Sequence, residues 1–453
     1  MNGVDRSGPP PAGPLRPFRA PPIERRVVAA DIPLFVVRIP RLPVVTAALV
    51  LRGAGETAAA PGEEGRASLT ADALDGGTKR RSGTALAEAL EAVGADASVS
   101  AGWDSTTASV SSPADRWGEG LDLLAEMVLA PGFPADEVDR SRDQALARVQ
   151  QRSKDPSALA ADRSAALFYA DGERYARPLQ GTDESLRALD RASLASWAEA
   201  RYRPGSAGLV VVGDVDADEV ERVAGSILAG WEGAAPVPPA PLGRGRFPDR
   251  GLHVIHRPGS VQSELRLGHP GAARGIPDHA ELVVANSILG GTFGSRLNMN
   301  LRETRGFTYG VRSNFAFRRG PGPFTVSTAV DTAVTAEAVS EAVKEVERYH
   351  RDGPTDDEVR SARDYIAGVF PLRLETTGRV AGRVSELFVH ELPDDDWTEL
   401  RERIRGVERA AAHAAIRRHV HPERLTIVVV GDADAVAGDL EALDLGPVTV
   451  HDR

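Results

Sequence analysis

The sequence contains an internal repeat, and this repeat restricts the possible folds more than any other feature. The sequence Asp-Glu-Val begins at residue 136 and again at residue 357, and each copy is followed four residues later by Arg-Asp. The sequence Val-Val-Val-Gly-Asp begins at residue 210 and again at residue 428. Two motifs that recur in the same order at offsets of 221 and 218 residues predict a tandem duplication. The length of 453 residues also suits two domains of about 200 residues each.

The duplication divides the chain into four expected segments. Residues 1–22 are rich in proline and arginine, and we expect them to be disordered. Residues 23–232 and 244–453 are expected to form an N-terminal and a C-terminal domain. Residues 233–243 lie between the domains and contain four prolines, at positions 236, 238, 239 and 241. Because such a segment fits neither a helix nor a central strand, we expect a stiff, extended linker.

Both halves show the same mixture of predicted strands and helices. In the first half we predict a buried strand over 44–51, a helix over 86–93 that stops at Gly94, a hairpin over 97–111, helices over 121–129 and 137–149, and a closing strand over 209–212. In the second half we predict a strand near 265, a helix over 280–289, a hairpin over 309–329 and a strand over 426–430. The prediction is an α+β fold with two homologous domains, each a mixed, mostly antiparallel sheet packed against helices.

Composition and charge exclude several classes of function. The formal net charge of −11 argues against a nucleic-acid partner, because such a partner requires a basic surface. The chain has no cysteine, so it has neither disulfides nor thiolate chemistry. The N-terminus lacks the apolar core of a signal peptide, and no apolar run is long enough to cross a bilayer. We therefore expect a cytoplasmic protein without a membrane partner.

The run from Gly65 to Ser82, with the predicted helix and the Ser/Thr-rich strand that follow it, resembles the zinc-binding helix of one metallopeptidase family. This is the pitrilysin or mitochondrial-processing-peptidase-like family, the inverzincins. In its active members the helix carries His-x-x-Glu-His, where two imidazoles on one helical face bind zinc and the glutamate activates water. The resemblance places Ser68, Ala71 and Asp72 at these three positions. One hydroxyl and one carboxylate cannot replace two imidazoles and a general base.

Two further observations indicate that the zinc site is lost. The first histidine of the chain is His253, so the first half contains no imidazole. Active relatives supply another glutamate ligand from a later helix, ahead of an Asp-Pro that corresponds here to Asp155-Pro156, but no glutamate occurs between Glu137 and Glu173. We therefore predict that this chain binds no metal or other cofactor, and we expect the zinc in a partner subunit.

The second half offers no alternative catalytic centre in the sequence. His419 and His421 could approach a metal together, but no third ligand is near in the sequence, so we predict surface or capping roles. His253 and His256 have the pattern of ordinary strand residues. No serine lies in a Gly-x-Ser-x-Gly motif, so nothing supports a serine hydrolase.

Residues 289–297 and 301–311 resemble the substrate-gripping segment of the same family. In the family an arginine, and a tyrosine seven residues later, reach into the zinc site of the facing domain or subunit; the resemblance assigns these roles to Arg302 and Tyr309. A guanidinium and a phenol can both donate hydrogen bonds to a peptide carbonyl as it becomes an oxyanion. The alternative is that Arg302 is a solvated helix residue and Tyr309 a packed strand residue with a satisfied hydroxyl.

A glycine-rich loop precedes this pair. Gly290, Gly291 and Gly294 could contact a substrate, and termination of the preceding helix explains them equally well. The loop is not a phosphate cradle, because no Lys-Ser/Thr follows it.

The resemblance covers residues 27 to 432 and implies a clam-shell half that pairs with a zinc-bearing homologous subunit around a shared chamber. The implied function is that of a non-catalytic, substrate-binding subunit of a heterodimeric zinc endopeptidase, inactive alone, which binds a peptide substrate. Two alternatives stay open. The chain could be a structural subunit of a larger assembly, or a peptide-binding or maturation accessory without proteolysis.

Overall fold

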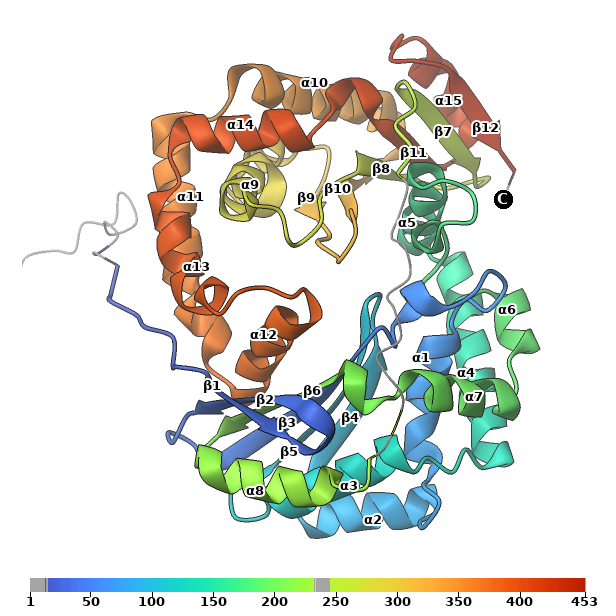
Figure 1. Ribbon diagram of the computed structural model, residues 1–453. Helices are drawn as coiled ribbons and strands as arrows, with labels where there is room; N and C mark the ends of the chain where they lie inside the picture. Colours follow the sequence, from blue (N-terminus) through green and yellow to red (C-terminus); the bar gives the residue numbers. More distant parts are fainter. Residues whose placement is uncertain (1–12, 14, 232, 234–244, 453) are drawn as a thin grey trace, which may run out of the picture.

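The computed structural model describes residues 13, 15–231, 233 and 245–452 (Figure 1). Two six-stranded sheets dominate the fold, one in each half of the chain, and helices pack against both. Apart from Gly233, the predicted linker over 233–243 lies outside the described residues.

The first sheet is mixed and mostly antiparallel. Its strand order is β1 (Glu24–Val28), β2 (Ile32–Arg38), β6 (Ala207–Gly213), β3 (Val44–Arg52), β5 (Ser105–Pro113) and β4 (Asp96–Ala101). Only β2 and β6 pair in parallel; the other neighbours are antiparallel. The alternation along β5 is complete, with every second residue buried, so one face of this strand is made of the hydroxyl-bearing side chains of residues 105, 107, 109 and 111.

The second sheet repeats this order. It runs β12 (Val448–His451), β7 (Gly251–His256), β11 (Thr426–Gly431), β8 (Gln262–Pro270), β10 (Pro323–Asp331) and β9 (Val311–Phe315). Five strands correspond between the sheets, including the parallel pair β7 and β11. The sixth strand differs: β1 is antiparallel to β2, whereas β12 is parallel to β7. The predicted fold class, an α+β duplication with two mixed sheets, is confirmed.

The helices of the first half are α1 (Arg66–Asp72), α2 (Gly83–Ala92), α3 (Trp117–Leu129), α4 (Ala135–Lys154), α5 (Pro156–Phe168), α6 (Asp183–Ala188), α7 (Arg191–Arg201) and α8 (Ala217–Leu228). Those of the second half are α9 (His279–Asn286), α10 (Thr335–Asp352), α11 (Asp356–Val369), α12 (Thr377–Val389), α13 (Asp395–Gly406), α14 (Arg409–His419) and α15 (Ala433–Glu441). Their starts follow from local chemistry: Ser82 caps α2 by accepting from the Ala85 N–H, and Thr355 with Glu358 forms a capping box at α11.

One helix from each half packs on the sheet of the other half. Helix α5 lies against β8 and β11, and α12 lies against β3 and β6 (Figure 1). Strands β6 and β11 are buried along their whole length, so both faces of each central strand require cover. The contact of α12 is apolar and includes Phe35, Val210, Val212, Val380, Val384 and Leu387. Each half therefore contributes a helix to the core of the other half, and we call this arrangement the interlock between the halves. It was not predicted from the sequence.

The described part of the N-terminal segment lies against the second half. The carbonyl oxygen of Pro21 accepts a hydrogen bond from Trp397 Nε1 at 2.7 Å, and that of Arg16 accepts from Arg401 Nη2 at 3.1 Å. The ring of Phe18 meets Phe370 edge-on. The proline- and arginine-rich composition of residues 1–22 predicts disorder, and it carries no periodic pattern from which these contacts could be inferred.

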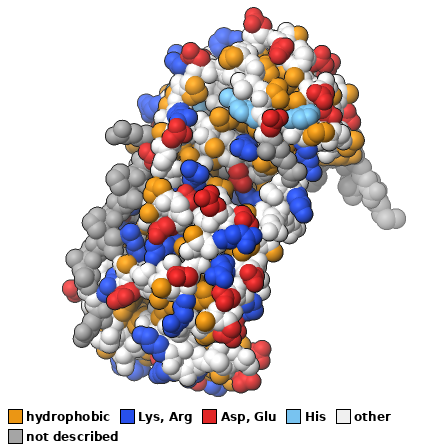
Figure 2. Space-filling model, turned by 90° about the vertical axis from the view of Figure 1, so that its right-hand side faces the viewer, with side chains coloured by type: hydrophobic (Ala, Val, Ile, Leu, Met, Phe, Trp, Pro, Cys, Tyr) orange, Lys and Arg blue, Asp and Glu red, His pale blue; other side chains and the backbone are white. Residues whose placement is uncertain are grey.

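Surface charge is mixed on the face shown in Figure 2, where acidic and basic side chains are interspersed and the histidines gather in the upper part. This distribution agrees with the confinement of all histidines to the second half of the sequence. In the described part of the chain, no helix combines the length and apolar character that crossing a membrane would require.

Candidate functional site

Helix α1 carries the three positions at which the resemblance places the zinc motif. Its start is fixed by Glu56, whose side chain is wholly buried. The Glu56 carboxylate accepts hydrogen bonds from the backbone N–H of Ser68 at 2.9 Å and of Gly65 at 3.2 Å, and it pairs with Arg174 at 2.8 Å. A carboxylate at a helix N-terminus accepts hydrogen bonds from free N–H groups and interacts favourably with the positive end of the helix dipole. The helix is thus firmly positioned, although it carries neither histidine nor glutamate.

Helix α4 packs against α1 and places the guanidinium of Arg148 beside Asp72. Arg148 Nη2 forms a short ion pair with Asp72 Oδ2. Both side chains line a pocket of about 520 Å³ together with Ser68, Gln144 and residues of β4. Burial raises the pKa of the Asp72 carboxyl above its usual range, and Arg148 opposes that shift.

These donors do not fit a zinc ion. Ala71 is buried and has no donor atom, while Ser68 uses its hydroxyl on the carbonyl of Leu179 at 3.4 Å. Asp72 is already paired with a guanidinium, and a zinc ion would have to share that carboxylate with Arg148. Zinc in proteins takes three or four imidazole, thiolate or carboxylate ligands, and this pocket offers two aspartates, Asp72 and Asp75, and no imidazole. Arg148 could not be identified from the sequence, since nothing in the periodicity of α4 distinguishes it from the other arginines of that helix.

Of the three glycines of the predicted loop, Gly290 and Gly291 end the π-helical turn η6 (Ser287–Gly291), and Gly294 lies between η6 and a second such turn, η7 (Asn298–Thr304). A Cβ atom on Gly290 would lie 2.5 Å from the backbone nitrogen of Ser313, so this glycine is required for close packing against β9. Gly291 is closely confined by Asn286, whereas Gly294 has open space around it. Of the three predicted loop glycines, Gly290 is therefore explained by packing, and Gly294 is free to lie beside a ligand. Short π-helical turns are frequent at functional sites.

Arg302 lies on η7 and projects over an exposed aromatic ring. Its Cζ atom is 4.0 Å from the centroid of the Phe293 ring, and its Nη1 donates to Glu303 at 2.7 Å. Phe293 is 68% exposed. The Arg302 guanidinium is thus oriented by two groups at the surface, and in the described part of the chain it pairs with no buried carboxylate. Phe293 was not identified from the sequence, although a large aromatic residue inside a glycine-rich loop is a usable signal.

Tyr309 is 97% exposed, although the backbone around it is well fixed. The side chain of Thr328 hydrogen-bonds to Thr308 Oγ1 at 2.9 Å and to the carbonyl of Gly310 at 3.0 Å. Asn298, which is buried, accepts from the Val311 N–H at 3.1 Å. The hairpin predicted from residue 309 begins as a strand only at Val311, so Tyr309 precedes it. The alternative in which Tyr309 is a packed strand residue is wrong.

The two predicted site regions are separate in this chain. Within the described residues, the pocket beside Ser68 and Asp72 is lined by the first half alone. Arg302 and Tyr309 belong to the second half and do not line it. This chain does not combine them into one site of its own.

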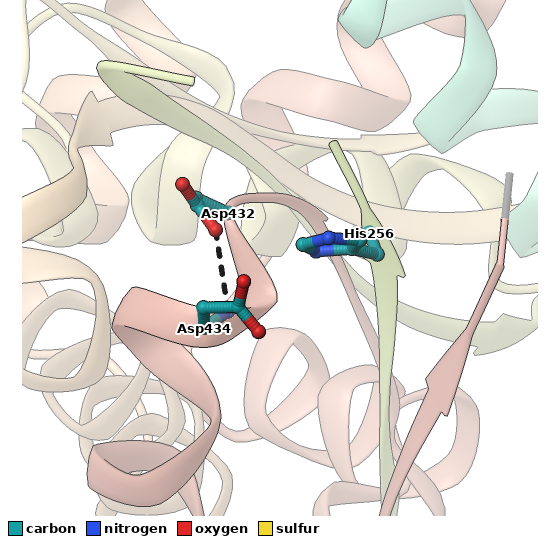
Figure 3. Close-up of side chains that lie close together, drawn as sticks. All are labelled: His256, Asp432 and Asp434. Atoms are coloured by element: carbon teal, nitrogen blue, oxygen red, sulfur yellow. Dashed lines mark hydrogen bonds between the residues drawn. The ribbon is translucent and has the colours of Figure 1, made fainter. Parts of the chain in front are cut away.

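Among the described residues, one group of side chains has the composition of a metal site, namely His256, Asp432 and Asp434 (Figure 3). The side chains of His256 and Asp432 are engaged in local capping, whereas Asp434 contributes its backbone N–H. His256 Nδ1 accepts from the Ala433 N–H at 3.1 Å, and the Asp432 carboxylate accepts from the N–H groups of Asp434 at 3.2 Å and Gly259 at 2.8 Å. With Nδ1 as an acceptor, neutral His256 carries its proton on Nε2, so neither ring nitrogen presents a free lone pair. The group is a helix cap for α15.

His419 and His421 do not act together. His419 Nε2 lies 3.1 Å from Oδ1 of Asp278, the residue before α9. The backbone N–H of His421 instead donates to Nε2 of the buried His269 at 3.0 Å. Burial lowers the pKa of His269 to about 4, which leaves it neutral.

Both halves of the chain match protein-family profiles. A profile described as the insulinase family, peptidase M16, matches residues 37–183, and one described as the peptidase M16 inactive domain matches residues 188–366. The chain belongs to the peptidase M16 family. It contains both the N-terminal and the C-terminal type of domain, in that order.

Relatives of the M16 chain differ in what their names state. A Mycobacterium tuberculosis protein named an uncharacterized zinc protease is 28% identical over 78% of this chain and 81% of its own length. A Helicobacter pylori protein named a non-peptidase homolog is 23% identical over 89% of this chain and 92% of its own length. A crystal structure from Pseudomonas fluorescens, described as a peptidase M16 inactive domain, has a TM-score of 0.85 at 26% identity and covers 91% of this chain and 98% of that one.

Proposed function

We propose that this M16 protein is the non-catalytic, substrate-binding subunit of a heterodimeric zinc endopeptidase. It supplies Arg302 and Tyr309 to the active site of a zinc-bearing homologous partner that cleaves peptides. The observation that carries the proposal is the exposure of Tyr309. A tyrosine that is almost wholly exposed on a fixed backbone, seven residues after an arginine stacked on an exposed phenylalanine, is suited to contact a second molecule.

The degenerate site supports the same proposal from the other half of the chain. An ion pair between Asp72 and Arg148 lies where the resemblance places the metal. Without imidazole ligands or a glutamate base, hydrolysis requires the zinc site of another subunit. The resemblance of residues 289–311 to a segment that acts across subunits supplies the reason for pairing with a homologue.

The first prediction is that the purified chain contains no stoichiometric zinc and cleaves no peptide by itself, because its first half has no imidazole. Metal content by mass spectrometry and a peptide-cleavage assay check both parts. One equivalent of zinc together with chelator-sensitive cleavage in a homogeneous sample would overturn the proposal.

The partner itself is tested by affinity purification from the source cells. We expect this chain to recover a homologue with an intact His-x-x-Glu-His sequence, at one-to-one stoichiometry. Recovery of a large assembly that contains no such homologue would favour the structural-subunit alternative.

A further inference from the structure

A basic cavity lies where helix α5 of the first half packs on the second sheet. It has a volume of about 340 Å³ and is bounded by α5, by a loop of the first half and by strands β8 and β10. Four arginines line it, Arg152 and Arg177 from the first half and Arg266 and Arg318 from the second. Among the described residues that line it, Asp162 is the one carboxylate. This excess of positive charge contrasts with the net charge of −11 of the whole chain.

Two of the four guanidiniums are neutralised by carboxylates of the chain. Arg152 Nη2 lies 2.7 Å from Asp162 Oδ1, and Arg266 Nη1 lies 3.1 Å from Glu264 Oε2. Both arginines keep a free donor, since Arg152 Nη1 and Arg266 Nε bond to no described residue. Neither atom is wholly buried, because the buried atoms without a partner do not include them. These arginines can therefore add hydrogen bonds to a bound anion without breaking their ion pairs.

The other two guanidiniums, those of Arg177 and Arg318, have no counter-ion in the part of the chain that the structure describes. Arg177 is exposed, whereas Arg318 is half-buried, with Cζ 4.2 Å from the centroid of the Trp103 ring and 4.5 Å from that of Tyr175. The Nη1 atom of Arg318 is wholly buried, but its Nε and Nη2 also lack a partner and are not wholly buried. A ligand can reach Arg318 through these two atoms. Two unpaired cations therefore remain at one cavity.

The acidic groups near Arg318 lie on its other side. Arg318 and Trp103 also line the cavity between β5 and α12, where the carboxylates are those of Asp96, Asp104 and Glu386. None of these three residues lines the cavity beside α5. An anion would therefore be attracted to the α5 side of Arg318 and repelled from the side of β5 and α12.

We propose that the cavity beside α5 binds two neighbouring acidic side chains of a peptide. Arg177 and Arg318 lie at different depths, so two separate carboxylates match them better than one compact dianion does. Each guanidinium presents parallel donors that fit a carboxylate. Thr325 and Ser327 of β10 line the same wall and add hydroxyl donors.

The position of the cavity favours a peptide as the bearer of these carboxylates. Leu179 and Gln180 line both this cavity and the pocket beside Ser68 and Asp72, so the two adjoin. A peptide that enters between the halves can therefore reach both. The identification of the ligand as a peptide rests on the proposed function, whereas the binding of acidic groups is measured on this chain alone.

The experiment uses the isolated full chain and three short peptides, capped at both ends, that differ only at two adjacent positions. These positions hold two glutamates, two glutamines, or phosphoserine and alanine. Calorimetry measures binding at low and at high chloride concentration. We expect the glutamate peptide to bind saturably, and more weakly as salt screens the charges, and the glutamine peptide not to bind. Equal or tighter binding of the phosphoserine peptide would overturn the assignment to paired carboxylates.

The decisive variants are Thr325→Asp and Thr325→Asn, which have nearly the same shape and differ in charge. The Thr325 side chain is half-buried in the cavity wall and hydrogen-bonds to no described residue. In Thr325→Asp the new carboxylate occupies the place of the ligand, so the glutamate peptide should bind at least about tenfold more weakly. This variant should also melt at a higher temperature than Thr325→Asn, because it supplies a counter-ion to unpaired guanidiniums. Thr325→Asn should bind the glutamate peptide as the wild type does.

Arg177→Gln removes one unpaired charge from an exposed side chain, so folding should be unaffected. We expect about fivefold weaker binding of the glutamate peptide, the scale of an exposed ion pair. The matched control is Arg163→Gln. Arg163 on α5 is also exposed and pairs with no residue that the structure describes, but it does not line the cavity, so binding should be unchanged.

Three results would each overturn the inference: unchanged affinity in both Thr325→Asp and Arg177→Gln, equal binding of the glutamine peptide, or no binding of the glutamate peptide at millimolar concentration. The zinc-bearing subunit takes no part in these measurements. Failure here would therefore leave the proposed function standing, and failure of the proposed function would leave the binding of acidic groups to be measured as described.

Discussion

Tyr309→Phe is expected to lower the turnover of the assembled complex by about a hundred- to a thousand-fold, the usual cost of removing one donor to a developing oxyanion. The substitution deletes only the hydroxyl. Because the Tyr309 side chain is 97% exposed and packs against nothing buried, folding and assembly should be unchanged. Arg302→Ala should have an effect of the same order, and Arg302→Lys should also fail in large part because a point charge cannot reproduce the planar fork.

Two controls separate a role in catalysis from a general surface effect. Tyr365→Phe changes another exposed tyrosine, on α11, and Arg305→Ala changes the arginine that follows Arg302 by three residues and pairs with Glu341. Both should leave cleavage at the wild-type rate. Each variant is mixed with the zinc-bearing subunit, the complex is verified by its size, and peptide cleavage is measured. Wild-type rates for both Tyr309→Phe and Arg302→Ala would mean that the pair is structural.

Asp396→Ala is expected to be the most destabilising substitution, by about 3–5 kcal/mol, because it leaves buried charge without a partner. The carboxylate of Asp396 pairs with Arg274 at 2.6 Å, Arg383 at 2.9 Å and Arg403 at 2.6 Å. Arg383 is on α12, the helix that covers the first sheet, so the loss should loosen the interlock between the halves. The free energy of unfolding from urea titration measures the effect.

The neighbouring Asp394 provides the control. It pairs with Arg25, but both side chains are about half exposed, so Asp394→Ala should cost less than about 1 kcal/mol. An equal cost for the two substitutions would contradict the role assigned to Asp396. Burial alone would raise the pKa of the Asp396 carboxyl, but the three guanidiniums outweigh it and leave the pKa lowered. Its contribution to stability is therefore present above the unfolded-state pKa and is lost as the pH falls through the lower folded-state pKa, and Asp396→Asn should reduce that acid sensitivity.

The repeat made the fold predictable, because two motifs at one offset require two copies of the same topology. The predicted strands over 44–51, 209–212 and 426–430 correspond to β3, β6 and β11. The packing of α5 and α12 on the sheet of the opposite half could not be inferred, since an apolar helical face does not specify which of two similar sheets it covers. The edge strands β1 and β12 are short and exposed, so they lack a strong hydrophobic pattern.

The candidate site was predictable only where residue identity decides the chemistry. The absence of any histidine before His253 excludes the family's zinc ligands in every alignment of the first half. Two contacts that explain the site depend on the three-dimensional structure, namely the pairing of Arg148 with Asp72 and the stacking of Arg302 on Phe293. The pairing of Arg148 with Asp72 joins residues on separate helices, and a single sequence has no local signal for such a pair.

We propose that this chain is catalytically inactive and yet required for cleavage. The most direct measurement is a titration of the isolated zinc-bearing partner with this chain, following peptide cleavage and zinc content. We expect negligible cleavage by either protein alone and a cleavage rate that rises until the two proteins reach a one-to-one molar ratio. We also expect one zinc ion per pair of subunits. Full activity of the partner alone, with no change on addition of this chain, would contradict it.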